Sequence, residues 1–439
     1  MFKLSKIIEY GFYLFVFLLP WQTRWMYSIG QINGSDWEYG TQSLYGTEIL
    51  LWSVLVGFII WTYKTHGLKL PSIKQVNKSK LLLMTAVLGL LVVSMLSIIW
   101  AQDTSLAIYA WYRLVLAATL FVFVLAFNVS LKKISIVFVM SAGIQSVLAI
   151  WQFLLQKSFA SKWFGIAEHI PTDLGASVVE NISSRWLRAY GSLPHPNVLA
   201  GFLVVGMLFL IMLAMRTEKS KRLFVITSFL LITPALFFTF SRSAWLAMMI
   251  CVLILVFYLF FKKDHSLNKI VVKSVLIIVI ILAILFLNLG DLVITRFLGA
   301  QRLESISTNE RQLYKEQARD LIFSQPLIGV GAGNYTLGVF NQIDSEQPAY
   351  YYQPVHNIFP LVFAELGGFG FLFFLLLVIL VISNTIMKGH LDNISVIYFL
   401  AFLSLLIISY FDHYLWTLYA GQMLMWLTLA MAVKSIKFS

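Results

Sequence analysis

Charged residues and cysteine are scarce in this chain. Only 12% of the 439 residues are Asp, Glu, Lys or Arg, whereas 59% are hydrophobic. A soluble protein of this length could not bury so much apolar surface, so the composition excludes a soluble globular protein and indicates a polytopic membrane protein. The single cysteine, Cys251, lies inside an apolar run. It therefore excludes a disulfide framework and a cysteine metal site.

Nucleotide-binding signals are also missing. The glycine-rich stretch Pro326–Tyr335 (PLIGVGAGNY) lacks the GK[ST] of a P-loop and follows no predicted strand, which excludes a nucleotide site of that kind. A tight turn or a backbone nest for an anion remains open. The chain has no internal repeat and no low-complexity segment, so we expect residues 1–439 to form a single membrane domain.

Apolar runs of about 20 residues are long enough to cross a bilayer as helices. The first run lacks a small-residue cleavage site, so we expect it to be retained as a span. Ser241–Ser243 is expected to divide the run 223–261 into two spans. The runs together predict an all-α protein with about 12 transmembrane helices, at 7–23, 47–63, 81–100, 109–130, 134–155, 197–215, 223–240, 243–261, 270–289, 357–386, 394–410 and 419–433.

The formal net charge of +12 indicates membrane topology rather than nucleic-acid binding. Most of the 32 Lys and Arg, but only four of the 20 Asp and Glu, fall in or next to one set of loops and the two termini. The positive-inside rule makes these segments cytoplasmic, namely both termini and loops 64–80, 131–133, 216–222, 262–269 and 387–393. The loops expected outside are 24–46, 156–196 and 290–355, with two short ones near 101–108 and 411–418.

The largest external loop, residues 290–355, is expected to contain short helices. Ser307–Glu310 (STNE) fits a capping box, so we expect a helix to start there and to end at Pro326.

Arginines gather on the predicted external face. Arg311 and Arg319 recur on one face of the loop helix, Arg242 would lie at the external mouth of two spans, and Arg188 precedes another span. Guanidinium groups bind phosphate bidentately, so this cluster suits a phosphate or diphosphate at the level of lipid headgroups. The simpler alternatives are a salt-bridged loop helix and, for Arg242, a side chain that reaches the membrane interface.

Arg113 lies within an apolar run, where a charge is costly unless it is paired or solvated. The simplest interpretation is a structural ion pair, with Asp103 in the neighbouring short loop as a candidate partner.

The stretch His356–Gly370 (HNIFPLVFAELGGFG) joins the large loop to an apolar run. An imidazole at this water–bilayer boundary could move protons next to a lipid headgroup. Gly367 and Gly370 would let a neighbouring helix approach closely. The alternative is a His-Asn pair that only starts a helix, with small-residue packing behind it.

Four short motifs follow one another between residues 188 and 370. They are Arg188-Ala189-Tyr190-Gly191 with His195-Pro196-Asn197, then Ser241-Arg242-Ser243-Ala244-Trp245, then Arg311 followed by PLIGVGAGNY, and finally His356-Asn357 with Gly367-x-x-Gly370 after nine residues. In this order they resemble the motifs of the O-antigen ligases and of related O-antigen polymerases, and the twelve-span layout extends the similarity over most of the chain.

The resemblance implies a GT-C-type fold in the bacterial inner membrane that transfers a glycan from an undecaprenyl-diphosphate carrier on the periplasmic face. It implies that His356 is the general base, that Arg242, Arg311 and Arg188 bind the donor diphosphate, and that Asn357, His195, Asn197, Arg319, Gly367 and Gly370 have supporting roles. The sugar is already activated, so the protein need only deprotonate an acceptor hydroxyl and stabilise the departing charge. Attack opposite the diphosphate would invert the anomeric centre.

The sequence has no Asp-x-Asp motif, so we expect guanidinium groups, rather than a metal ion or another cofactor, to neutralise the phosphates. The acceptor stays open. A lipid A core acceptor would make a ligase, another carrier-linked repeat a polymerase, and a Ser or Thr a protein O-oligosaccharyltransferase. No Arg is followed by Gly eleven positions later, a pattern frequent in polymerases, and this favours a ligase. A twelve-span transporter or flippase is the non-enzyme alternative, although charges gathered on one face do not suit a carrier site at the midplane.

Overall fold

The computed structural model describes residues 2–66, 78–180, 184–216, 222–298, 302–387 and 392–436. Helices dominate these residues, but two antiparallel hairpins correct the all-α expectation: β1 (Arg24–Ile32) with β2 (Ser35–Tyr45), and β3 (Val178–Glu180) with β4 (Arg185–Leu187). Asn33 and Gly34 join β1 to β2, and both have positive φ (49° and 75°). This is the conformation that an Asn-Gly hairpin turn requires.

Each of the twelve expected spans contains a helix, but fewer than twelve suit a membrane crossing. Eight of the described helices are long and apolar enough. The shorter α7 and α13 have 17 residues each, about 25 Å against a hydrocarbon core of about 30 Å. The structure therefore supports a polytopic membrane protein with eight to ten spans rather than twelve. The helices are α1 (Phe2–Leu18), α2 (Gly46–His66), α3 (Lys78–Leu96), α4 (Thr104–Ala126), α5 (Leu131–Leu155), α6 (Pro196–Met215), α7 (Arg222–Phe238), α8 (Arg242–Phe261), α9 (His265–Leu298), α12 (Ile358–Met387), α13 (Asn393–Ser409) and α15 (Tyr419–Ser435).

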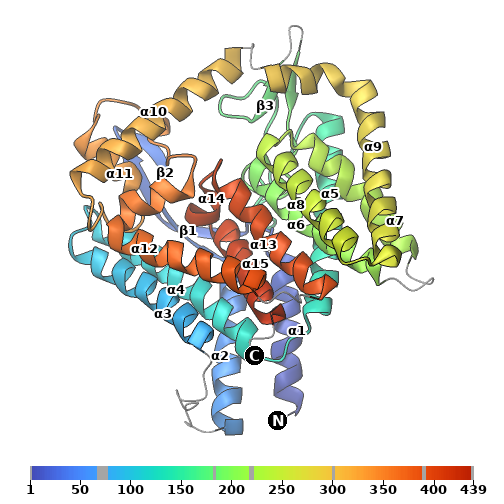
Figure 1. Cartoon of the computed structure of the whole chain (residues 1–439). Helices are drawn as coiled ribbons and strands as arrows, with labels where there is room; N and C mark the ends of the chain where they lie inside the picture. Colours follow the sequence, from blue (N-terminus) through green and yellow to red (C-terminus); the bar gives the residue numbers. More distant parts are fainter. Residues whose placement is uncertain are drawn as a thin grey trace.

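The chain folds into one bundle of helices, and the short helices and hairpins of its longer connections gather at the end away from the two termini (Figure 1). Helices α6 and α15 are buried along almost their whole length, and α13 packs against both. Helix α15 thus lies in the core of the bundle, although its 17 residues span only about 25 Å. As predicted, the run 223–261 is two helices, but they are separated at Thr239–Ser241 rather than at Ser241–Ser243.

At the opposite end of the bundle, side chains near the ends of helices link neighbouring helices to each other. Lys133 Nζ at the start of α5 lies 3.1 Å from Glu9 Oε1 in α1, and Lys434 Nζ in the last turn of α15 donates to Phe127 O after α4. The other end carries both hairpins, α10 (Arg302–Ser324), α11 (Tyr335–Gln342) and α14 (Tyr414–Thr417). We call it the polar end.

Helix α10 begins at Arg302, five residues before the expected capping box at Ser307–Glu310, so that prediction was wrong. Arg, Leu and Glu at 302–304 are good helix formers and extend the helix toward its N-terminus. The C-terminal boundary was predicted correctly, since α10 ends at Ser324, before Pro326.

Helix α12 is interrupted at Gly367, which has φ 64° and ψ −171°. The break frees the carbonyl of Glu365 to accept a hydrogen bond from Gly331 N (2.9 Å), while Gly368 N donates to Pro326 O (2.8 Å). A Cβ at Gly367 would lie 2.2 Å from Leu327 O. The absence of a side chain at Gly367 therefore lets the turn after α10 pack against α12. We had expected a neighbouring helix to pack there.

At Gly370 the nearest neighbour lies on the same helix. A Cβ there would meet the Leu366 side chain of the same helix at 2.3 Å. Both glycines of the last motif thus shape α12 itself and its contact with the glycine-rich stretch Pro326–Tyr335.

Candidate active site at the polar end

Three arginines from three helices line one cavity at the polar end. Arg242 starts α8, Arg296 lies in the last turn of α9, and Arg311 belongs to α10. The cavity has a volume of about 260 Å³ and is also lined by Asn197, Ser241, Ser243, Leu246 and Phe411. We call it the arginine cavity. It brings together Arg242 and Arg311, which the sequence identified, and adds Arg296, which it did not.

The turn between α7 and α8 fixes the first of these arginines. Phe240 has a positive φ of 47°, and the indole of Trp245 stacks on Phe237 with centroids 5.7 Å apart and donates to Leu236 O (3.2 Å). Arg242 Nη1 donates to Arg296 O (3.0 Å), and Arg296 Nε donates back to Phe240 O (3.3 Å). The Ser-Arg-x-x-Trp motif therefore anchors this wall of the arginine cavity.

The electrostatic character of the arginine cavity suits an anion. Among its described lining residues there are three guanidinium groups and no carboxylate. Ser241–Ser243 also expose the N-terminus of α8, where the first backbone N–H groups have no carbonyl partner within the helix. Such helix ends carry partial positive charge and bind phosphate groups readily.

A chain of hydrogen bonds leads away from the arginine cavity. Arg188 is 4% exposed. It donates from Nε to Thr239 O (2.7 Å) and from Nη2 to Asn197 Oδ1 (2.6 Å). Asn197 Nδ2 in turn donates to Asp412 Oδ2 (2.7 Å). Arg188 thus orients Asn197, which lines the cavity, and is not itself among the lining residues described.

His195 is the N-cap of α6. Its Nδ1 accepts from Asn197 N (3.1 Å), and its Nε2 pairs with Ser177 Oγ (2.9 Å). Burial and the nearby Arg188 lower its pKa to about 3, so the ring is neutral at pH 7. The imidazole therefore caps the N-terminus of α6.

His356 lies against a second histidine. Its ring centroid is 5.1 Å from that of His413 and 5.7 Å from that of Tyr314. His356 Nδ1 lies 3.1 Å from Pro354 O. A carbonyl can only accept, so Nδ1 carries the hydrogen and the neutral ring keeps its lone pair on Nε2. Asn357 caps α12, because its Oδ1 accepts from Phe359 N (3.0 Å).

Asp412 and His413 complete this cluster from the loop between α13 and α14. Burial and the adjacent His356 lower the pKa of His413 to about 3, against the opposing effect of Asp412. Burial alone would raise the pKa of Asp412, but the three nearby histidines and the hydrogen bond from Asn197 hold it below its usual range. At pH 7 the cluster therefore pairs an ionised carboxylate with a neutral His413.

Two residues lie elsewhere. Arg319 is exposed on α10, where it pairs with Asp320 (3.2 Å) outside the arginine cavity. Arg113 is not paired with Asp103, which instead caps α4 by accepting from Leu106 N (3.0 Å). Arg113 bonds to Tyr109 and to Ser43 O, because the unexpected β1–β2 hairpin brings polar groups to it.

Sequence reasoning missed Arg296, Asp412 and His413. Arg296 follows a long apolar run, and the Asp-His pair stands in a short loop on the same predicted face as His356. Their location on the same predicted membrane face as His356 was the sequence signal that could have identified them as site residues. Within the described ranges, no group of three or more His, Cys, Asp or Glu side chains is arranged to hold a metal ion.

Comparison with known proteins identifies the central part of the chain. Residues 227–375 match the model of the O-antigen ligase family (Wzy_C), whereas no curated protein matches the chain. The matched segment holds Arg242, Arg296, Arg311 and His356. The family implies a glycosyl-transferring enzyme of the ligase or polymerase type, with lipid-linked glycans as substrates. Residues 227–375 of this polytopic membrane protein are therefore an O-antigen ligase domain.

Proposed function

We propose that this chain transfers a glycan from an undecaprenyl-diphosphate-linked donor to a hydroxyl of a lipid A core oligosaccharide, with inversion at the anomeric carbon. The observation that carries the proposal is the joining of the arginine cavity to the histidine pair. Asn197 lines the cavity and is bonded to Asp412, and the next residue, His413, contacts His356. A cavity suited to the donor diphosphate is thus connected to His356, an imidazole that can accept the proton of an acceptor hydroxyl.

The donor diphosphate occupies the arginine cavity in this proposal. Arg242, Arg296 and Arg311 offer charge-assisted hydrogen bonds to its oxygens, and the N-terminus of α8 adds backbone donors. These groups stabilise the charge that develops as the bond between the anomeric carbon and the diphosphate oxygen breaks. Arg188 acts one step away by orienting Asn197.

His356 is the general base. Its Nε2 lone pair takes the proton of the acceptor hydroxyl as that oxygen forms a bond to the anomeric carbon. The Nδ1–H bond to Pro354 O fixes the tautomer that this step needs. The proton ends on His356, and the leaving diphosphate keeps the electron pair of the broken bond.

The proposed setting is a GT-C-type fold in the bacterial inner membrane, with the polar end periplasmic and both termini cytoplasmic. The charge distribution supports this orientation, since most Lys and Arg fall in loops expected at the opposite end. A polymerase or a protein O-oligosaccharyltransferase would use the same donor chemistry on a different acceptor. A transporter or flippase remains the non-enzyme alternative, which the site's position at one end of the bundle does not favour.

One assay separates these classes. The purified protein is given an undecaprenyl-diphosphate-linked glycan with a lipid A core oligosaccharide, a second carrier-linked repeat, or a Ser/Thr peptide. Free undecaprenyl diphosphate and a larger core oligosaccharide are expected only with the first acceptor. Product with another acceptor would reassign the activity within the superfamily. No release with any acceptor, together with movement of the intact donor across a vesicle membrane, would favour a flippase.

A further inference from the structure

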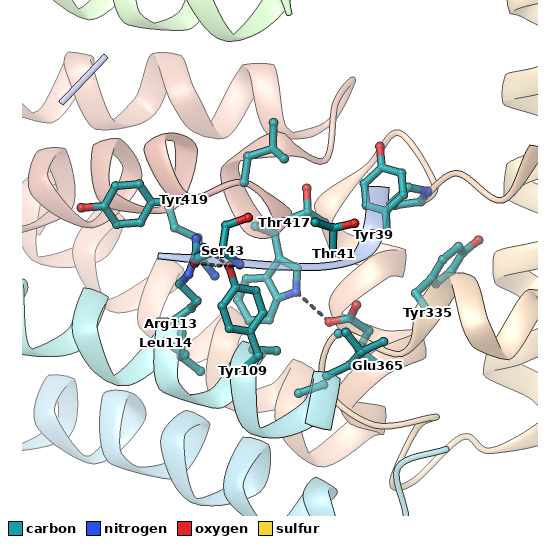
Figure 2. Close-up of a pocket in the computed structure, with 18 of the residues that line it drawn as sticks. Tyr39, Thr41, Ser43, Tyr109, Arg113, Leu114, Tyr335, Glu365, Thr417 and Tyr419 are labelled. Atoms are coloured by element: carbon teal, nitrogen blue, oxygen red, sulfur yellow. Dashed lines mark hydrogen bonds between the residues drawn. The ribbon is translucent and has the colours of Figure 1, made fainter. Parts of the chain in front are cut away.

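A second cavity adjoins His413 of the histidine pair. It has a volume of about 110 Å³, and five tyrosines line it: Tyr39, Tyr45, Tyr109, Tyr335 and Tyr419. Figure 2 shows these rings, except for the unlabelled Tyr45, around Ser43, Arg113 and Glu365. We call it the tyrosine pocket. Strand β2 forms part of its wall, so the hairpin that the sequence did not predict helps to build it.

Two residues that line the tyrosine pocket contact His413 of the histidine pair. Thr417 lines the pocket, and Thr417 Oγ1 lies 2.8 Å from His413 Nδ1. The ring of Tyr39 meets that of His413 with centroids 5.7 Å apart. A ligand in this pocket would thus lie next to Thr417 and Tyr39, the two lining residues that contact His413. Asp412 and Asn197, in contrast, connect His413 to the arginine cavity.

The charges of the two cavities differ. The tyrosine pocket is lined by two cations, Arg24 and Arg113, and two carboxyl groups, Glu38 and Glu365, whereas the described lining of the arginine cavity has cations alone. The carboxyl groups make the tyrosine pocket less positive than the arginine cavity and therefore less suited to a phosphate. Tyrosine rings with hydroxyl, guanidinium and carboxyl groups between them suit a neutral ligand that has both apolar faces and many hydroxyls.

Three buried polar atoms of the residues that line the pocket have no partner for a hydrogen bond within the described residues: Ser43 Oγ, Arg113 Nε and Tyr419 Oη. Ser43 Oγ and Arg113 Nε are both buried, in residues 2% and 5% exposed. Arg113 is held with its guanidinium over the rings of Tyr109 (4.6 Å), Tyr419 (5.0 Å) and Tyr45 (5.1 Å). Buried polar groups are costly unless they are satisfied, and a ligand hydroxyl could satisfy both a serine and a guanidinium N–H.

We propose that the tyrosine pocket binds a neutral sugar of the acceptor and directs its hydroxyl toward His356. This inference rests on the proposed transfer reaction and adds the acceptor subsite to it. Donor and acceptor then occupy two separate cavities, which have no described lining residue in common. The arginine cavity selects for the diphosphate, and the tyrosine pocket selects for the sugar that is to be extended.

Ser43→Ala is the sharpest test. The hydroxyl makes no hydrogen bond within the described residues, so its removal should leave the fold intact. If it binds an acceptor hydroxyl, the KM for the core oligosaccharide should rise about three- to tenfold while the KM for the lipid-linked donor stays unchanged. An unchanged acceptor KM, or a raised donor KM, would overturn the proposal.

Ala110→Leu tests the pocket by volume. Ala110 lines the pocket on α4, and the added carbon atoms should raise the acceptor KM by about tenfold or more. Ala126→Leu is the matched control, because Ala126 is exposed at the far end of the same helix. Equal effects of the two substitutions would show that the pocket is not the acceptor site.

Direct binding separates this inference from the proposed function. Equilibrium dialysis of labelled, delipidated lipopolysaccharide core oligosaccharide against the detergent-solubilised protein needs no donor. We expect wild type and Arg242→Ala to bind it alike and Ala110→Leu to bind it at least about tenfold more weakly. If the three proteins bound the oligosaccharide as expected but the wild type carried out no transfer, only the proposed transfer reaction would be contradicted. If the wild type carried out transfer but Ala110→Leu bound the core oligosaccharide as tightly as the wild type does, only the assignment of the acceptor pocket would be contradicted.

Discussion

The imidazole of His413 lies edge-on to that of His356, with ring centroids 5.1 Å apart and planes at 65°. His413 is also bonded to Thr417 on one side and follows Asp412 on the other. The histidine pair is thus connected to the tyrosine pocket through Thr417 and to the arginine cavity through Asp412 and Asn197. A proton taken up at His356 would be stabilised there by the ionised Asp412 nearby.

Arg296 should matter to donor binding as much as the two arginines found from the sequence. Arg296→Ala should weaken binding of the lipid-linked donor about ten- to a hundredfold, because it removes charge-assisted hydrogen bonds to the diphosphate. Arg296→Lys should restore binding only in part, since lysine keeps the charge and loses the planar fork. Donor affinity is measured with labelled undecaprenyl diphosphate.

Arg319→Ala is the matched control, because Arg319 is an exposed arginine on the same helix as Arg311 but outside the arginine cavity. We expect near wild-type affinity for this variant. If Arg319→Ala weakened donor binding as much as Arg311→Ala, the cavity would not be the diphosphate site.

His413 should make the stability of the protein sensitive to acid. Its pKa in the folded protein is lowered to about 3, because the ring is buried neutral beside His356. Below about pH 6.5 the unfolded chain binds a proton that the folded chain does not, so stability falls as pH falls, by up to about 1.4 kcal/mol per pH unit for this group. Thermal unfolding in detergent between pH 7.5 and 5.5 measures the slope.

His413→Asn keeps a group that can bond to Thr417 but does not titrate, so the Tm of this variant should depend less on pH. His265→Asn, at the exposed first residue of α9, should keep the wild-type slope. An unaltered slope in His413→Asn would mean that this ring is not buried in its neutral form.

Gly367→Ala should damage the site through the backbone. Gly367 adopts φ 64° and ψ −171°, a region essentially confined to glycine, and an added Cβ would clash with Leu327 O. We expect a loss of stability of about 3 kcal/mol or more, seen as a lower Tm and yield. Gly143→Ala should be neutral or slightly stabilising, since a Cβ there meets nothing within 4 Å in the interior of α5. Similar losses in both would contradict this account of the motif.

The proposed orientation predicts opposite labelling of two loops. In a Cys251→Ala background, Ser345→Cys at the exposed polar end should react with an impermeant thiol reagent from the periplasmic side. Ser72→Cys, in a segment outside the described residues, should react only after the membrane is opened. Labelling of Ser72→Cys from outside would reverse the topology and remove the active site from the periplasmic face.

Much of the fold was predictable because helices in lipid follow apolar runs. The break at Thr239–Ser241 and the end of α10 before Pro326 both follow from local sequence. The β1–β2 hairpin escaped notice because β1 is exposed along most of its length and so lacks an alternating pattern. Its Asn33-Gly34 turn was the one local signal.

The site was predictable only where a residue belonged to a motif. Arg242, Arg311 and His356 were identified in this way. His413 and Arg296 became candidates only when the tertiary fold brought separate segments together. The sequence predicted that Gly367 allows a close approach of another segment. It did not predict which segment approaches, because the spacing of the glycines does not show that α12 is interrupted at Gly367 and contacts the turn after α10.

The most direct test of the account is single-turnover transfer by His356→Ala with an undecaprenyl-diphosphate-linked glycan and a core oligosaccharide. Transfer should fall by about 10²- to 10⁴-fold while the donor still binds with wild-type affinity, because only the proton acceptor is lost. His195→Ala should be milder, since His195 caps a helix. Wild-type turnover in His356→Ala, or lost donor binding with unchanged turnover of the bound fraction, would contradict the assignment of His356 as the base.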